Sequence, residues 1–223
     1  MERNRLINLA LCFLALLNVT FSCRVKNIYS ETTKSIVQFN NCINSDSLFS
    51  HFPSKIVNSE LLSGYYNIPV KGNCFGSILL CLKQSDEIIN KIQSGKFIMS
   101  DSLNSDNFFT LEYDRLTDTS RYSHNLENEN KLPITDFYET NYLIGELPDS
   151  TYLYDEKMYV PISKYAPPAD LKIFIIDAKP GSIWKEQCNK PSSSSLSNWQ
   201  NGYSRGYAIS QKNKIIVYWI VVW

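Results

Sequence analysis

Apolar residues along this chain are gathered into short runs, and polar, loop-forming stretches separate them. The run at residues 215–223 is apolar at every position, which predicts a strand buried on both faces in the core. The polar residues 211–214 just before it predict the turn of a hairpin, with Gly202 and Gly206 shaping the entry to that hairpin. Strands are also expected at residues 96–100, 107–113 and 171–177, and the unbroken apolar run at 78–82 predicts either a buried strand or a turn of helix.

One segment carries the signals of a helix at both ends. Ser85 can accept hydrogen bonds from the free backbone N–H groups, acidic residues occupy the first turn, and Gly95 can end the helix. Residues 178–181 predict a turn, and aromatic runs on both sides of the charged residues 155–157 predict a second hairpin, over residues 150–162. The fold class predicted is α+β: a mainly antiparallel sheet with one or a few short helices and the C-terminal strand buried in the core.

The N-terminus has the layout of a secretory signal. Residues 1–5 contain two arginines and one glutamate, and the stretch 6–17 that follows is apolar except for Asn8. A helix needs about 20 predominantly apolar residues to span a bilayer, and this stretch is shorter. The sequence therefore predicts an exported protein.

The residues that follow, Thr20-Phe21-Ser22-Cys23, resemble the lipobox of bacterial lipoproteins, in which a small residue precedes an invariant cysteine. The usual pattern has Leu three residues before the cysteine and a small residue two before it; with Thr20 and Phe21 there, the sequence is similar to the looser lipoboxes of Bacteroidetes. The resemblance implies that Cys23 carries a diacylglycerol, with palmitate among its acyl chains, and becomes the first residue of the mature chain. It implies a protein anchored in the bacterial cell envelope, facing the periplasm or the surface. The alternative is soluble secretion with cleavage near Ser22.

These features divide the chain into a signal peptide, a tether and one domain. We expect the signal over residues 1–22, a loosely held tether over 23–40, and a single α+β domain over 41–223. Residues 114–133 are polar and rich in loop formers, so they predict a long loop or a subdomain boundary within that domain.

The cysteine count fits an anchored protein. Cys12 leaves with the signal, and lipidation of Cys23 leaves an even number of cysteines in the mature chain. The candidates for two disulfides, in any of three connectivities, are Cys42, Cys74, Cys81 and Cys188. A Cys74–Cys81 bridge requires a chain reversal between the two residues, because even on a helix they would be about 10 Å apart. The alternative is that these cysteines are small buried apolar residues.

Charge and motifs exclude several classes of function. The chain has 22 basic and 22 acidic residues, which argues against nucleic acid as a partner. It has only two histidines, and no metal, cofactor or catalytic motif is expected. Residues 202–206 fit the letters G-x-S-x-G, but a nucleophile elbow needs a strand before the serine and a helix after it. Acid pairs such as Asp155 with Glu156, and Glu139 with Glu146, match the residue types of a glycosidase without fixing their distance.

Aromatic residues provide the candidate binding site. All four tryptophans lie in the last 40 residues; Trp219 and Trp223 belong to the apolar strand, whereas Trp184, Trp199 and Tyr203 lie in loop-like sequence and are predicted at the surface. Residues 199–223 also look similar to the ends of uncharacterised bacterial envelope proteins. The leading hypothesis is a non-enzymatic, lipid-anchored domain that binds an envelope protein. The alternatives are a glycan-binding surface lipoprotein and, third, an envelope hydrolase.

Overall fold

The computed structural model describes residues 30, 33–45, 47–56, 60–68, 75–114, 119–123, 131–137, 168–185 and 199–223. The signal, the cysteine expected to carry the lipid and the hairpin expected at 150–162 lie outside these residues. None of the helices in the described part of the chain is long and apolar enough to cross a membrane.

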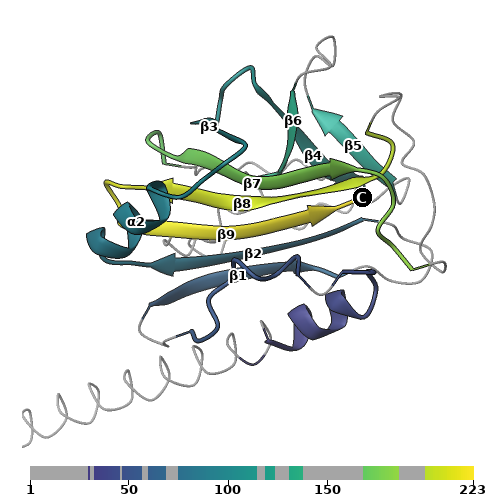
Figure 1. Ribbon diagram of the computed structural model, residues 1–223, viewed down its shortest axis with the longest axis horizontal. Helices are drawn as coiled ribbons and strands as arrows, with labels where there is room; N and C mark the ends of the chain where they lie inside the picture. The colour runs from purple at the N-terminus through teal and green to yellow at the C-terminus, as the bar shows by residue number, and fades with distance from the viewer. Residues whose placement is uncertain are drawn as a thin grey trace, which may run out of the picture.

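Two sheets form the described fold (Figure 1). The larger has six strands, each antiparallel to its neighbours, in the order β1 (Leu61–Asn67), β2 (Gly76–Lys83), β9 (Ile215–Val222), β8 (Gly202–Ser210), β7 (Lys172–Pro180) and β3 (Met99–Ser102). The smaller has three strands in the order β5 (Thr119–Ser123), β4 (Phe108–Asp114) and β6 (Leu132–Thr135). β4 and β6 are parallel, and β5 is antiparallel to β4. The predicted α+β class with a mainly antiparallel sheet is confirmed.

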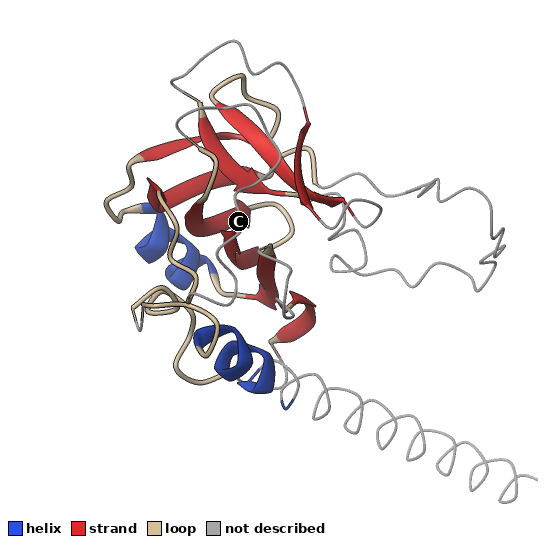
Figure 2. Cartoon of the chain, turned by 90° about the vertical axis from the view of Figure 1, so that its right-hand side faces the viewer, coloured by secondary structure: helices blue, strands red, loops and turns tan. Residues whose placement is uncertain are grey.

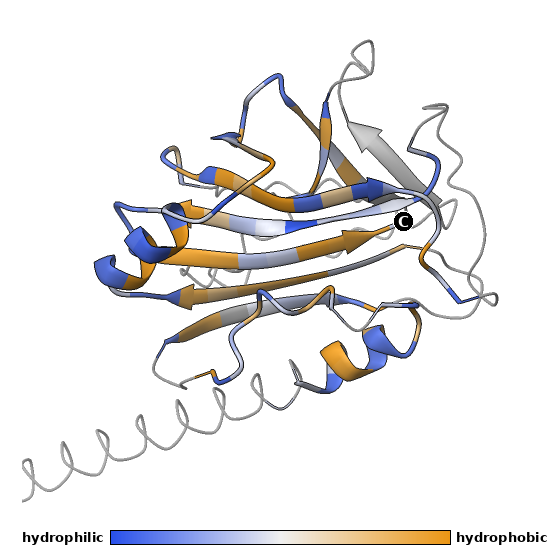
Figure 3. Cartoon of the chain, in the orientation of Figure 1, coloured by the Kyte–Doolittle hydropathy of each residue, from blue (hydrophilic) through white to orange (hydrophobic). Residues whose placement is uncertain are grey.

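The strand β9 lies in the middle of the large sheet, as its apolar sequence predicts. It pairs with β2 along one side and with β8 along the other, and all of its residues are buried. In Figure 3 apolar residues cover much of β7 and β9. The four-residue turn between β8 and β9 is also as predicted, and its Lys214 adopts a positive φ of 55°.

The large sheet has two covered faces, with a separate apolar cluster on each. Face A carries the side chains of Tyr203, Arg205 and Tyr207, and it packs against residues 33–56, Trp184 and the helix α2 (Asp86–Gln93). Face B carries Trp219 and packs against residues of the small sheet, including Phe109 and Ile134. Figure 2 shows the arrangement from the side, with helices on one side of the large sheet and strands on the other.

The predicted helix is confirmed as α2, and its capping residue is the expected one. The Ser85 hydroxyl accepts a hydrogen bond from the Ile88 N–H, and Ile89 is fully buried against face A. The ammonium group of Lys214 lies 2.7 Å from the Asp86 carboxylate, which joins the start of α2 to the β8–β9 turn.

A second helix corrects the expected extent of the tether. Residues 33–40 are helical, and the side chain of Phe39 is fully buried in the cluster on face A. The reason is the helical apolar spacing of Ile36 and Phe39, which places both side chains toward the sheet. Residues 33–40 therefore belong to the domain, and any loosely held leader ends before them.

Three further boundaries differ from those expected. β5 lies inside residues 114–133, where a long loop or a subdomain boundary was predicted. β3 begins at Met99, three residues later than the strand expected at 96–100. β7 continues through Pro180 because it pairs with β8 up to Gly202, so the chain turns at Gly181, whose φ is +108°.

Candidate functional site

The three aromatic residues predicted at the surface do not form an exposed platform. Trp184 is 4% exposed, forms an isolated β-bridge with Ile43 and packs its ring 6.0 Å from the ring of Phe39. Tyr203 is 7% exposed, and both residues belong to the cluster on face A. Trp199 is half-buried against face B, with its ring 5.8 Å from that of Trp223. The surface prediction is therefore wrong for Trp184 and Tyr203, because tertiary packing covers segments that have loop-like sequence, whereas Trp199 keeps part of its surface exposed.

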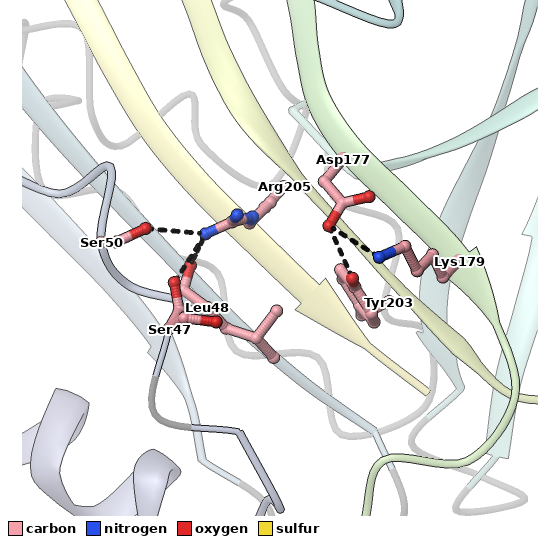
Figure 4. A network of polar contacts seen from close by, with 7 residues as sticks. All are labelled: Ser47, Leu48, Ser50, Asp177, Lys179, Tyr203 and Arg205. Carbon is pink, nitrogen blue, oxygen red and sulfur yellow. Dashed lines mark hydrogen bonds and ion pairs between the residues drawn. The ribbon is translucent and has the colours of Figure 1, made fainter.

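A network of polar side chains lies on face A and includes Tyr203 (Figure 4). The hydroxyl of Tyr203 donates to Oδ2 of Asp177 over 2.6 Å, and the Lys179 ammonium lies 3.7 Å from the same oxygen. Burial, and then the hydrogen bond to Asp177 and its negative charge, raise the pKa of Tyr203 to about 12. A phenol with this pKa stays protonated at neutral pH, so it acts here as a hydrogen-bond donor.

Arg205 holds a distant segment of the chain against β8. Its Nη1 donates to the carbonyl oxygens of Ser47 and Leu48, over 2.7 and 2.9 Å, and to the hydroxyl of Ser50 over 3.1 Å. These partners lie in a turn in which the Ser50 N–H donates to the Ser47 carbonyl. The guanidinium therefore caps the turn at residues 47–50 and ties it to the sheet (Figure 4).

His51 adds a second tie between the same segment and the sheet. Its Nε2 lies 3.0 Å from the main-chain oxygen of Trp219 on β9. Its ring meets the rings of Phe52 and Tyr207 edge-on, at 4.7 and 5.6 Å between centroids. Burial, together with the positive charge of Arg205, lowers the pKa of His51 to about 4, so the imidazole is neutral at pH 7.

The register of β7 and β8 brings these side chains together. Asp177 is the cross-strand partner of Arg205, and Lys179 is that of Tyr203, so all four lie on one face. A register shift between Ile175 and Asp177 makes this possible, because a bulge changes which residues face each side. The sequence gives no signal for the shift, and Asp177, Arg205 and His51 were not among the predicted site residues.

Two other carboxylates have shifted pKa values, and each closes a turn. Hydrogen bonds from the Ser105 hydroxyl, the Ser102 N–H and Asn107 lower the pKa of Asp101. Burial opposes the charged form of Asp170, but hydrogen bonds from the Lys212 N–H and the Ser210 hydroxyl outweigh it and lower its pKa.

The remaining candidates for chemistry are the acid pairs and groups of metal-ligating side chains. Asp155 and Glu156, and Glu139 and Glu146, lie outside the described residues. In the described part of the chain, no group of three or more metal-ligating side chains comes together. Residues 202–206 belong to β8, which pairs with β7 along one side and with β9 along the other. The segment that fits G-x-S-x-G is therefore part of a strand and does not form a nucleophile elbow.

Cys81 and Cys42 lie on opposite faces of the large sheet. Cys81 is fully buried on face B within β2, and burial raises the pKa of its thiol to about 12. Cys42 packs against the cluster on face A, and its thiol donates to the Gln38 carbonyl oxygen over 3.5 Å. Because the sheet separates them, Cys42 and Cys81 do not form a disulfide with each other. Cys74, Cys188 and Cys23 lie outside the described residues.

A Cys74–Cys81 bridge is excluded by the extended strand between them. β2 runs straight from Gly76, so Cys81 is about 17 Å further along at about 3.3 Å per residue. The two residues before Gly76 span at most about 7.6 Å, whereas bridged Cα atoms lie within about 7 Å of each other. Of the three connectivities, only Cys42–Cys74 with Cys81–Cys188 contains neither of the excluded pairs, Cys42–Cys81 and Cys74–Cys81. The surroundings of Cys81 fit a buried free thiol better than a disulfide.

The comparisons with known proteins give no family. No protein-family model matches the chain, and neither a curated protein nor a solved structure matches it.

Proposed function

We propose that this chain is a lipid-anchored cell-envelope protein whose domain binds another envelope protein and catalyses no reaction. The observation that carries the proposal is the N-terminus: a charged start, a short apolar stretch and Thr20-Phe21-Ser22-Cys23. Lipid on Cys23 holds the domain at the bacterial membrane, on the periplasmic or the outer surface. A near-equal number of acids and bases argues against nucleic acid as the partner.

The described domain supports a binding role in place of catalysis. The ionisable groups with shifted pKa values are engaged in the fold or buried in it: Asp101 and Asp170 close turns, Tyr203 bonds to Asp177, and His51 ties a segment to β9. Neither shifted carboxylate has the raised pKa expected of the acid of a glycosidase pair. Trp184 and Trp199 lie on different faces, which removes the platform expected for a glycan.

The anchor is tested by metabolic labelling with a palmitate analogue, followed by membrane fractionation. We expect the wild-type protein to take up label and sediment with membranes, and Cys23→Ala to lose the label and leave the membrane. Cys12→Ala is the matched control, because that cysteine leaves with the signal and its loss should change neither result. Unlabelled wild-type protein, or a labelled Cys23→Ala variant, contradicts the anchor.

The partner class is tested with the soluble domain, starting at Arg24, immobilised and crosslinked to envelope extract. Enrichment of one protein in stoichiometric yield, reproduced with the purified partner, supports the proposal. Binding on a glycan array, with a matched polysaccharide competing for it, would replace the proposal with the glycan hypothesis.

A further inference from the structure

Residues 47–52, here called the latch, bridge the N-terminal helix and the large sheet. Their side chains Leu48, Phe49 and Phe52 are buried in the cluster on face A. Two polar ties reinforce this packing: Arg205 on β8 binds the turn, and His51 reaches the main chain of β9. The latch thus depends on one permanently charged group and one titratable group.

The hydrogen bonding of His51 fixes its protonation state. A carbonyl oxygen only accepts hydrogen bonds, so Nε2 carries the hydrogen that it donates to Trp219. Nδ1 then presents a lone pair, and this atom is buried with no hydrogen-bond partner among the described residues. The main-chain oxygens of Leu48 and Gly206 favour the charged imidazole, as that of Trp219 does, but burial of the ring outweighs them and disfavours a second proton.

The charges around His51 make that proton still less favourable. The His51 ring faces two side chains of β8, the guanidinium of Arg205 and the hydroxyl-bearing ring of Tyr207. Tyr218 on β9 contacts the ring of Phe52, the residue next to His51. Asp177 bonds to Tyr203 and Lys179, and Glu60 accepts from Gln84. No carboxylate in the described part of the chain bonds to the imidazole, so no negative charge would balance the cation beside Arg205.

We propose that the latch is acid-sensitive: protonation of His51 detaches residues 47–52 from β8 and β9 while the pairing within the large sheet persists. The open segment exposes His51 to water, where the imidazolium is solvated. The ladder from β1 to β7 contains no other described histidine and keeps its hydrogen bonds. This inference does not depend on the proposed function.

The expected size of the effect follows from proton linkage. The pKa of His51 is about 4 in the closed form, against 6.5 for an exposed histidine, so the open form binds the proton more tightly. The closed form is fully stabilised above pH 6.5 and loses that stabilisation as the pH falls toward 4. The opening equilibrium should rise about 20-fold from pH 7 to pH 5, and about 100-fold by pH 4.

Amide hydrogen exchange of the full domain measures the opening directly. The N–H groups of Ser50 and Phe52 are hydrogen-bonded inside the latch, and those of β9 report on the sheet. After correction for intrinsic exchange, we expect protection of Ser50 and Phe52 to fall about 20-fold between pH 7 and pH 5, with β9 unchanged. In His51→Gln, whose amide can still donate to Trp219, protection should be independent of pH.

Two results would overturn the proposal. One is the same pH dependence in wild type and His51→Gln, and the other is loss of protection in β9 in parallel with the latch. Because His51→Gln alters the packing, NMR titration of the wild-type imidazoles provides a second test. His124→Gln leaves His51 as the only histidine and assigns its signals. A His51 resonance that titrates near 6.5 contradicts the closed geometry, and one near 4 supports it.

Discussion

Gly206 on β8 lies directly against the main-chain carbonyl of Phe174 on β7, so closely that a Cβ atom at this position would overlap the carbonyl oxygen. The contact lies beside the register shift between Ile175 and Asp177. Glycine is therefore required here by the close approach of two backbones. The same approach positions Asp177 opposite Arg205.

Gly206→Ala should destabilise the domain, although alanine ordinarily stabilises a strand interior relative to glycine. We expect a loss of about 3 kcal/mol in the free energy of unfolding, because the backbone of β7 must shift. Gly181→Ala is the matched control: a Cβ there meets no atom, and only its positive φ is strained, so about 1 kcal/mol is expected. Chemical denaturation measures both, and equal losses would contradict the overlap.

Tyr203→Phe removes the hydrogen bond to Asp177 and should cost about 1 kcal/mol at neutral pH. The folded pKa of about 12 lies above the ordinary value of 10, so this tyrosine stabilises the fold fully below pH 10. That contribution is lost as the pH rises from 10 toward 12.

The difference in stability between wild type and Tyr203→Phe should therefore shrink in alkali. Denaturation at neutral pH and near pH 11 measures it. Asp177→Asn keeps an acceptor oxygen but removes the charge, which lowers the folded pKa of Tyr203, so its alkaline loss should be smaller and should end at a lower pH than in wild type. A constant difference between wild type and Tyr203→Phe across this range would show that the phenol does not titrate with folding.

Arg205→Gln should raise the pKa of His51, because the guanidinium charge is one of the causes that lower it. Burial is the larger cause, so the pKa should stay below 6.5 while the latch remains closed. Arg205→Lys retains the charge and should leave the His51 pKa low. NMR titration of the imidazole compares the variants, and an unchanged pKa in Arg205→Gln would show that the charge is screened.

Cys81 should resist alkylation in the folded protein. It is fully buried, and burial raises its thiol pKa to about 12, so the reactive thiolate is absent at neutral pH. Mass spectrometry after iodoacetamide treatment should find Cys81 unmodified in native protein and modified in denaturant without a reductant. Modification that requires a reductant would instead indicate a Cys81–Cys188 disulfide.

The sequence predicts those parts of the fold that depend on local pattern. The unbroken apolar run gives β9 and its central place, and the serine cap with acidic first turn gives α2. The helix over residues 33–40 was missed, yet Ile36 and Phe39 have the spacing of one helical face. An i, i+3 pair of apolar residues in an otherwise polar stretch is the local signal for this helix.

The candidate site depends on contacts between residues far apart along the chain, which no local sequence pattern predicts. Tyr203 lies in a strand interrupted by Ser204 and Gly206, which makes the segment resemble a loop, and the glycine is explained only by the backbone of β7. Arg205 finds its partners at residues 47–50, far away along the chain. Likewise, the burial of Trp184 follows from the bridge to Ile43, which forms only in the folded domain.

The central position of β9 also sets the order in which the domain assembles. In the large sheet β9 lies between β2 and β8, so it joins the pair β1–β2 to the strands β8, β7 and β3. Lys83 at the end of β2 pairs with Ile215 at the start of β9, although the two residues are far apart along the chain. Until β9 pairs with β2, β1 and β2 can form only a hairpin, whose apolar edge has no neighbour. Pairing between such distant segments folds slowly and leaves apolar strand edges open to aggregation. A newly made chain is therefore expected to need protection until β9 inserts between β2 and β8.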